Sequence, residues 1–171
     1  MSNQICVKEY DREAAVAYAH QWAMKRNPQY ADFEKMGGDC TNFASQVLFA
    51  GGRVMNQTPT FGWYYFGLGN RAPAWTGVQY LYNFLLKNQG LGPFGHEVSV
   101  QDARPGDLAQ LAFKPGVFSH SPVIVSTGSQ PSLRNIQIAA HSIDSDNRPL
   151  SSYQCVGIRF IHIDGFRFYK G

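Results

Sequence analysis

A change in the period of the apolar residues near residue 90 constrains the fold of this chain more than any other feature. Before that point apolar side chains recur at helical spacing, and after it short apolar runs are separated by turns rich in Gly, Pro and Asn. Helices followed by strands are typical of an α+β fold with an antiparallel sheet, and not of a parallel doubly wound sheet. A length of 171 residues predicts a single domain over 1–171.

Three helices are expected in the first half, over about 11–25, 39–52 and 76–90. Asp11 and Asp39 are the expected N-caps of the first two. A long aromatic and glycine-rich loop is expected between the second and third helices. In the second half, strands are expected to begin near Val98, Leu108, Pro122, Ile136 and Val156, and a last tight hairpin is expected to turn at Asp164-Gly165.

Composition excludes several classes of protein. The net charge of +3 is spread along the chain without a block of like charges, which argues against a nucleic-acid partner. Apolar runs do not approach the ~20 residues that span a bilayer, so no membrane span is expected. The N-terminus lacks the basic and apolar regions of a signal peptide, which predicts a protein that is cytoplasmic as synthesised. A monomer is expected.

The three cysteines, Cys6, Cys40 and Cys155, are widely spaced and form no Cys-x-x-Cys pair, which argues against structural zinc. They are expected to be reduced, although a Cys6–Cys155 disulfide is compatible with the sequence. The segment 144–147 alternates like a calcium loop but lacks the glycine and the distal Glu of such a loop. We therefore expect neither a metal nor a cofactor.

Cys40 is the most informative residue. Gly37 and Gly38 precede it, which lets the backbone turn tightly, and its place in the first turn of a helix would stabilise a thiolate and a developing oxyanion. The competing interpretation is a buried, inert cysteine. The adjacent Asp39 would raise the pKa of the thiol unless its carboxylate is turned away to cap the helix.

A cysteine nucleophile needs a base, and histidine is the usual one. His20, His96 and His162 are interpreted as structural or surface residues. His120 is expected to begin a strand and His141 to end the next one, so that antiparallel pairing would bring the two imidazoles together, one as base and the other as its orienter. The alternative for each is a histidine at the edge of the sheet.

The run from Gly38 to Gln46, followed by Gly51-Gly52, resembles the signature of the putative amidase domain family. That family is similar to the papain-like cell-wall hydrolases, including the CHAP (cysteine/histidine-dependent amidohydrolase/peptidase) domains. The likeness spans about residues 10–153, through an opening helix, an aromatic segment, the Pro105-Gly-Asp107 turn, the strand from His120 to Val125, and the motifs at 141–144 and 147–150.

The resemblance implies a papain-like α+β fold, with helices packed on a C-terminal antiparallel sheet. It implies Cys40 as nucleophile and His120 as base, with His141 as third member and Asp144 as its competitor. Ser121-Pro122 departs from the smooth apolar strand of the family, because proline removes a donor from the ladder, and this predicts an edge or a bulge. The candidate substrate-binding residues are Asp39, Asn42, Trp63 and Trp75; core is favoured for Trp75 and a place in the cleft for Trp63.

These observations predict a cysteine-dependent hydrolase of amide bonds. The expected substrate is peptidoglycan or a peptide, and the bond lies either between the lactyl ether and L-alanine or within the stem or cross-bridge peptide. Without a signal peptide, such an enzyme would reach the wall as a phage lysin (endolysin) or by another export route. Two alternatives stay open: a non-catalytic cell-wall binding module, and a thiol acyltransferase with an amine acceptor in place of water.

Overall fold

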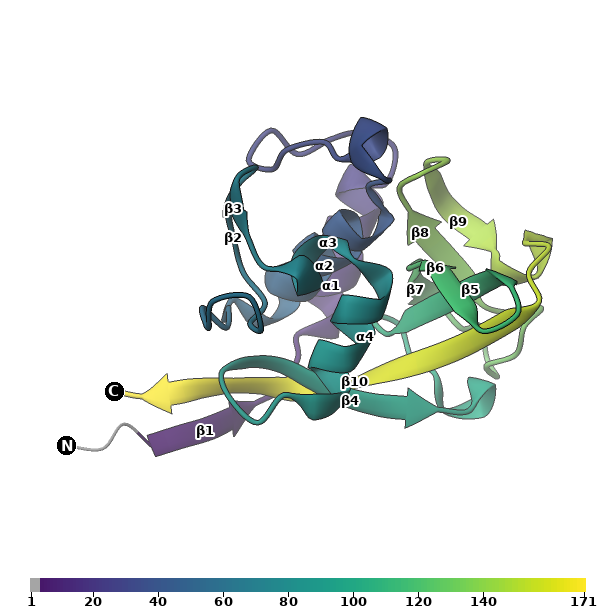
Figure 1. Ribbon diagram of the computed structural model, residues 1–171. Coiled ribbons are helices and arrows are strands. Elements are labelled where there is room, and N and C mark those ends of the chain that lie inside the picture. Colours follow the sequence, from purple (N-terminus) through teal and green to yellow (C-terminus); the bar gives the residue numbers. More distant parts are fainter. Residues whose placement is uncertain (1–3) are drawn as a thin grey trace.

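The computed structural model describes residues 4–171 as an α+β fold, which confirms the predicted class. Its helices gather on one side of a large antiparallel sheet, as Figure 1 shows. The helices are α1 (Arg12–Trp22), α2 (Cys40–Gly52), α3 (Pro73–Thr76) and α4 (Val78–Lys87), with short 3-10 turns at Glu34–Met36, Val100–Asp102 and Leu150–Ser152.

The main sheet has eight strands in the order β1-β10-β5-β7-β8-β9, with β4 beside β10 and β6 beside β5. Its strands are β1 (Gln4–Lys8), β4 (Gly92–Val98), β5 (Leu108–Lys114), β6 (Val117–His120), β7 (Val123–Ser126), β8 (Gln137–Ala140), β9 (Ser145–Pro149) and β10 (Gly157–Lys170). A small hairpin of β2 (Tyr65–Gly67) and β3 (Asn70–Arg71) lies within the segment expected to be a loop.

The helix predictions are confirmed in outline and corrected in detail. Asp11 caps α1 by accepting a hydrogen bond from the backbone N–H of Ala14 at 2.9 Å, but the helix ends at Trp22 and not at Lys25. The third predicted helix is α4, which begins at Val78 and ends at Lys87; the short helix α3 lies before it, in the segment expected to be a loop, and the extended backbone of Gly77 separates the two.

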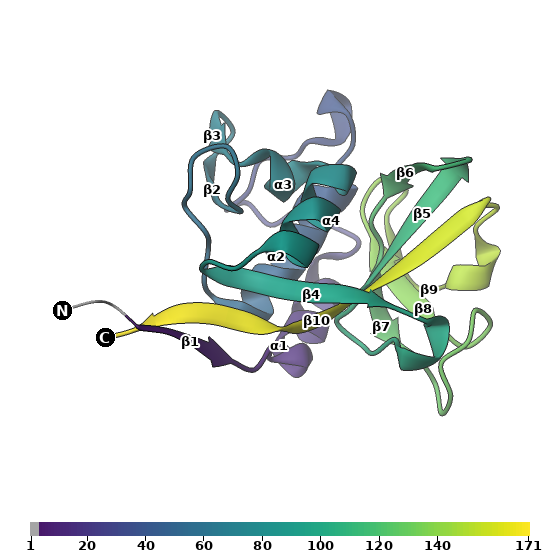
Figure 2. The same cartoon turned by 60° about the horizontal axis from the view of Figure 1, so that its bottom comes forward.

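The strand predictions contain two errors near the chain ends. Asp164-Gly165 does not turn: β10 continues through it with a register shift between Ile163 and Gly165, so that one long strand pairs with β1, β4 and β5. The N-terminal strand β1 was not predicted at all. Figures 1 and 2 show β10 running from the curled part of the sheet to the end where β1 joins it. All three cysteines are free.

The sheet is buried on both faces by two separate groups of side chains. Leu108, Val123 and Ile161 pack with the helices in one core, while their chain neighbours Ala109, Ile124 and Phe160 pack in a second core on the opposite face. The two-residue period of a strand produces this division. Helix α2 is buried on almost all sides, which fits its mostly apolar or small residues.

Candidate active site

Cys40 lies in the first turn of α2 and is 7% exposed. Gly37 and Gly38 before it both have φ of 105°, a left-handed conformation that glycine adopts without strain. The backbone N–H of Asp39 donates to Ser142 Oγ at 3.0 Å, and a Cβ on Gly38 would stand 3.2 Å from the same oxygen. The glycines therefore let the start of α2 approach the turn between β8 and β9.

The surroundings of the Cys40 thiol act on its pKa in opposite directions. Burial raises the pKa and outweighs the backbone N–H of Ser121 and the hydroxyl and N–H of Thr41, which lower it by hydrogen bonding to sulfur. The charge of Asp39 adds a smaller rise. The sequence predicted a thiolate stabilised by the helix N-terminus, whereas in the structure desolvation is the larger effect and favours the neutral thiol.

His120 is the last residue of β6, opposite Leu111 on β5. The register shifts between Leu111 and Ala112, and Ser121-Pro122 separates β6 from β7, which confirms the predicted irregularity. His120 therefore ends one strand and does not begin the next. Its Nε2 lies 3.3 Å from the hydroxyl of Tyr153.

Burial and, to a smaller extent, the nearby positive charge of Arg148 together lower the pKa of His120 to about 4. At neutral pH both the His120 imidazole and the Cys40 thiol are therefore neutral in the resting state. A neutral imidazole is a proton acceptor, so His120 is in the form that a general base requires.

Thr41 and Ser121, which directly follow Cys40 and His120 in the chain, connect α2 to the segment between β6 and β7. Thr41 Oγ1 donates to Ser121 Oγ at 3.3 Å, and Gln110 Nε2 on β5 donates to the same oxygen at 3.1 Å. The backbone N–H of Ser121 also helps to lower the pKa of the Cys40 thiol, as expected for a donor near the sulfur. The start of α2 is thus held against the break between β6 and β7, with both candidates at the junction.

A groove of about 430 Å³ opens beside His120. Its walls come from β5, β6, the β8–β9 turn, β9 and the segment after β9, and its lining residues are Phe113, Ser119, His120, Ser142, Ile143, Arg148, Ser152, Tyr153 and Gln154. Cys40 is not among these lining residues, but Ser142 bonds the backbone next to it, so one wall of the groove lies against the start of α2.

His141 does not contact His120 through a hydrogen bond, although β7 and β8 pair as predicted, with Val123 opposite Ala139. Its Nδ1 lies 2.5 Å from Asp39 Oδ2 and its Nε2 lies 2.8 Å from the carbonyl oxygen of Trp22. Both partners accept hydrogen bonds, so the ring satisfies both when each nitrogen carries a proton. Stacking on Phe43 at 4.2 Å completes its burial.

Asp144 is turned away from His120 and binds Arg26, with bonds of 2.8 and 3.1 Å from the two terminal nitrogens of the guanidinium. The same guanidinium lies within 4 Å of Asp32, Glu34 and Asp39. Arg26 thus joins the segment after α1, the start of α2 and the β8–β9 turn. Its Nε is buried without a hydrogen-bond partner among residues 4–171.

The four residues expected to bind substrate are all buried and offer no surface to a ligand. Trp63 and Trp75 are 0% exposed; their indole N–H groups donate to Ser45 and Asn42 of α2. Core is therefore confirmed for Trp75, and the cleft position expected for Trp63 is wrong, because the loop that carries it folds back onto the helices.

Asp39 and Asn42 face inwards as well. Asp39 is the N-cap residue of α2, but its side chain makes no cap bond; it accepts from the N–H of Phe33 at 2.9 Å and from Asn42 Nδ2 at 2.8 Å. These bonds and the one to His141 turn the carboxylate away from the cysteine. Both residues therefore order the loop before α2.

Sequence reasoning missed Tyr153 and Arg148 as site residues. Tyr153 contacts the His120 ring, and the guanidinium of Arg148 lies 3.7 Å from the centre of the Tyr153 ring. The conspicuous Asn-Arg-Pro turn was the available signal, but it gives no indication of which way Arg148 points.

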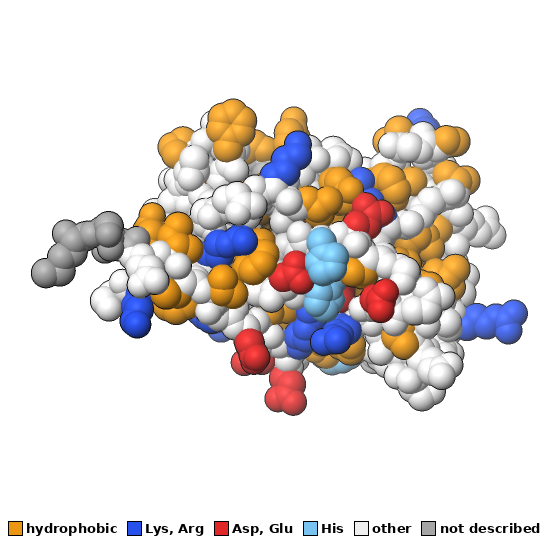
Figure 3. Space-filling model, turned by 90° about the horizontal axis from the view of Figure 1, so that it is seen from below, with side chains coloured by type: hydrophobic (Ala, Val, Ile, Leu, Met, Phe, Trp, Pro, Cys, Tyr) orange, Lys and Arg blue, Asp and Glu red, His pale blue; other side chains and the backbone are white. Residues whose placement is uncertain are grey.

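The other histidines bind carboxylates away from the groove. His20 bonds Asp146, His96 bonds Asp164, and His162 bonds Asp107, each at 2.8–2.9 Å. Figure 3 shows histidine side chains between acidic and basic ones on the face seen from below.

Among residues 4–171, no group of three or more His, Cys, Asp or Glu side chains is arranged to hold a metal ion. None of the helices described is long and apolar enough to cross a membrane.

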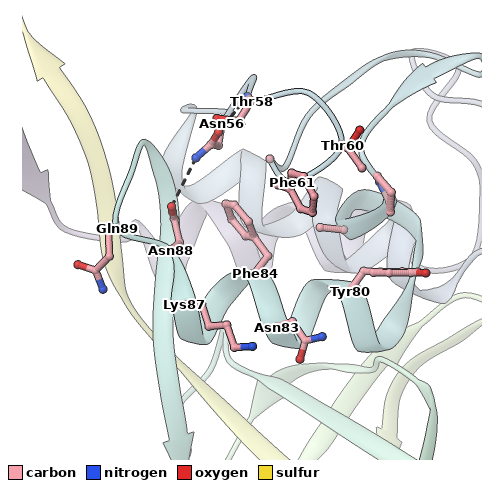
Figure 4. A pocket seen from close by; sticks show the side chains of 13 residues that line it. Asn56, Thr58, Thr60, Phe61, Tyr80, Asn83, Phe84, Lys87, Asn88 and Gln89 are labelled. Carbon is pink, nitrogen blue, oxygen red and sulfur yellow. Dashed lines mark hydrogen bonds between the residues drawn. The ribbon is translucent and has the colours of Figure 1, made fainter.

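A larger cavity of about 530 Å³ lies between the 56–62 loop and α4. Figure 4 shows the rings of Phe61, Tyr80 and Phe84 around it, with the amides of Asn56 and Asn88 joined by a hydrogen bond. Neither Cys40 nor His120 is among the residues described as lining it. The largest cavity described is therefore separate from the two candidate catalytic residues.

Comparison with known proteins finds a match to one family model and to one curated relative. A family described as a putative amidase domain matches residues 9–163. The uncharacterized protein YhbB of Bacillus subtilis (strain 168) is 35% identical over 122 residues, which cover 69% of this chain and 38% of that protein. The match thus spans less than half of the relative's length. No solved structure matches the chain.

Proposed function

The chain belongs to the putative amidase domain family, whose description indicates a hydrolase of amides, and we propose that it cleaves amide bonds with Cys40 as nucleophile and His120 as base. The observation that carries this proposal is the junction at which the start of α2 meets the break between β6 and β7. Of the two cavities described above, His120 lines the one at this junction. A nucleophile, a neutral base and an entrance are the parts that such a reaction needs.

In the proposed reaction His120 removes the proton of the Cys40 thiol as sulfur attacks the carbonyl carbon. A sulfur–carbon bond forms, and the carbonyl oxygen becomes an oxyanion that the N–H groups at the start of α2 can stabilise. His120 then gives the proton to the departing amine as the carbon–nitrogen bond breaks. Water, deprotonated by the same imidazole, hydrolyses the thioester and restores the thiol.

Tyr153 and His141 take different supporting roles in this proposal. Tyr153 contacts His120 directly, and burial raises the pKa of its hydroxyl, which keeps the phenol protonated. His141 is a positioning residue: it binds Asp39, which orders the loop before Cys40. Asp144 supports the same region through Arg26.

Peptidoglycan is the substrate that we propose, on the resemblance to the cell-wall hydrolases described above. The test is mass spectrometry of the fragments released from purified cell wall. Parent protein should release peptide fragments with new amine and carboxylate ends, whereas Cys40→Ala should release none. Cys6→Ala and Cys155→Ala are matched controls, because they remove the other two thiols.

The same experiment separates the alternatives. Wall breakdown by Cys40→Ala at the parent rate would disprove cysteine catalysis. Binding to the wall without any cleavage by the parent would indicate a binding module. Products joined to an added amine, in place of hydrolysed ends, would indicate an acyltransferase.

A further inference from the structure

The groove beside His120 contains one fixed charge. Of its lining residues, only Arg148 carries a permanent charge, and none is acidic. Among residues 4–171, no carboxylate oxygen lies within 4 Å of the guanidinium of Arg148. Arg26 contrasts with it, since four carboxylates surround that side chain.

Contacts on two sides hold Arg148 in place. Its Nε donates to Ser152 Oγ at 2.8 Å, and its guanidinium lies 3.7 Å from the centre of the Tyr153 ring. The Tyr153 hydroxyl in turn lies 3.3 Å from His120 Nε2. Arg148, Tyr153 and His120 therefore form a stack that reaches from the groove to the base.

This arrangement leaves part of the guanidinium free. The side chain of Arg148 uses one of its five N–H donors in the bond to Ser152, and the guanidinium also acts on the Tyr153 hydroxyl, whose pKa burial raises and Arg148 lowers. A planar guanidinium with its terminal nitrogens free is suited to a bidentate bond with a carboxylate.

We propose that Arg148 binds a carboxylate of the substrate, and that the bond cleaved lies in a peptide with a free carboxylate near the scissile amide. This inference rests on the proposed function, because it assigns the substrate class of that site. The carboxylate can be a chain end or an acidic side chain. Both present the same group to Arg148.

The groove also offers apolar surface on either side of this cation. Ile143 is 80% exposed and Phe113 is 45% exposed. Ser142 and Ile143 have φ of 61° and 70° at the centre of the β8–β9 turn, a conformation that a β-branched residue rarely adopts. The turn thus presents an apolar side chain at the groove, which suits a substrate with a short aliphatic group next to its carboxylate.

Binding of a carboxylate would also help the chemistry. The positive charge of Arg148 opposes protonation of His120 and contributes to its low pKa. A bound carboxylate neutralises that charge, so the imidazolium forms more readily while substrate occupies the groove. Recognition would then favour proton transfer from Cys40.

The first test needs no knowledge of the natural substrate. Iodoacetate and iodoacetamide alkylate a thiol by the same displacement of iodide, and only iodoacetate carries a carboxylate. The ratio of the two rates at Cys40 should fall about 10-fold in Arg148→Gln relative to the parent. Arg148→Lys should keep part of the preference, because it retains the charge. Arg134→Gln is the matched control, since it removes an equal charge from an exposed loop.

Cys6, on β1, serves as internal reference in each protein. An unchanged ratio in Arg148→Gln would overturn the proposal. So would a Cys40 that reacts with neither reagent, because the groove would then not reach the thiol.

The second test uses cell wall whose carboxylates have been converted to amides. Parent protein should cleave native wall at least 10-fold faster than amidated wall, mainly through KM, and Arg148→Gln should cleave both at the same low rate. If the parent cleaves native and amidated wall at equal rates, and this cleavage depends on Cys40, the role of Arg148 is disproved while the proposed function stands. Cleavage independent of Cys40 would disprove the proposed function, while the alkylation ratio would still decide on Arg148. The fragments of native wall identify which carboxylate lies beside the cut.

Discussion

Two buried histidines lie at strand ends, His120 at the end of β6 and His141 directly after β8, and their surroundings differ. His120 has one hydrogen-bond partner among the described residues, Tyr153, and a groove beside it. His141 has an acceptor at each ring nitrogen and stacks on Phe43. A histidine that exchanges protons needs a nitrogen that can lose its partner, whereas one with both nitrogens bonded holds other groups in place. The first environment suits catalysis and the second suits structure.

The largest expected effect is on His120. Replacement of His120 with Ala should lower the rate of amide hydrolysis about 10⁴-fold or more, because the thiol loses its proton acceptor. Alkylation of Cys40 by iodoacetamide should slow as well. His20→Ala is the matched control, since that histidine binds Asp146 outside the groove. Near-parental turnover by His120→Ala would exclude it as the base.

His141 should affect stability first and activity second. His141→Ala should lower the free energy of unfolding by about 3–5 kcal/mol, because it leaves the buried Asp39 carboxylate without its closest partner. Denaturant unfolding measures this change. Turnover of the folded variant should fall about 10- to 1000-fold through displacement of the loop before Cys40, and His141→Asn should recover part of it.

A variant His141→Ala that unfolds at the same denaturant concentration as the parent would contradict the structural role. Normal stability with a large loss of turnover would instead place His141 in direct contact with the reaction.

Acid should destabilise the parent through His120. The pKa of His120 is about 4 in the folded state and about 6.5 when unfolded, so the unfolded chain binds the extra proton first as pH falls. This contribution to stability is present at pH 7 and decreases from about pH 6.5 to pH 4, by about 3 kcal/mol. His120→Gln should lack it. Parallel stability curves for parent and variant over this range would show that His120 titrates normally.

The smallest effect is expected at Asp144. Asp144→Asn should cost about 1 kcal/mol, because Asp144 and Arg26 are each partly exposed and solvent screens their ion pair. Turnover should stay near that of the parent. An inactive, folded Asp144→Asn together with a nearly normal His141→Ala would mean that Asp144 orients His120, which the observed contacts do not favour.

Local sequence patterns predicted much of the fold. The 3.6-residue period before residue 90 and the two-residue period after it predicted the α+β class, and Asp11 and the glycine pair at 51–52 marked helix ends. The same local reasoning failed at Asp164-Gly165. A turn dipeptide can be held extended when strands pair on both sides of it, as β1 and β4 do here.

The sequence also singled out Cys40, because a cysteine after two glycines at a helix start is a local feature; it left His120 and His141 as candidate bases, and the family resemblance favoured His120. What each side chain faces is decided by segments far away in the chain. Asp39 meets His141 across 102 positions, and Tyr153 meets His120 across 33. Such contacts leave no periodic signal.

The tertiary structure alone therefore decided that Trp63 is core and that Asp39 binds His141. It also placed the groove at Arg148. The physical reason is that burial and hydrogen bonding depend on which surfaces meet when the helices pack on the curled sheet. The sequence by itself determined which side chains are candidates for a nucleophile or a base, and packing determined which of them line the groove and which bind other buried groups.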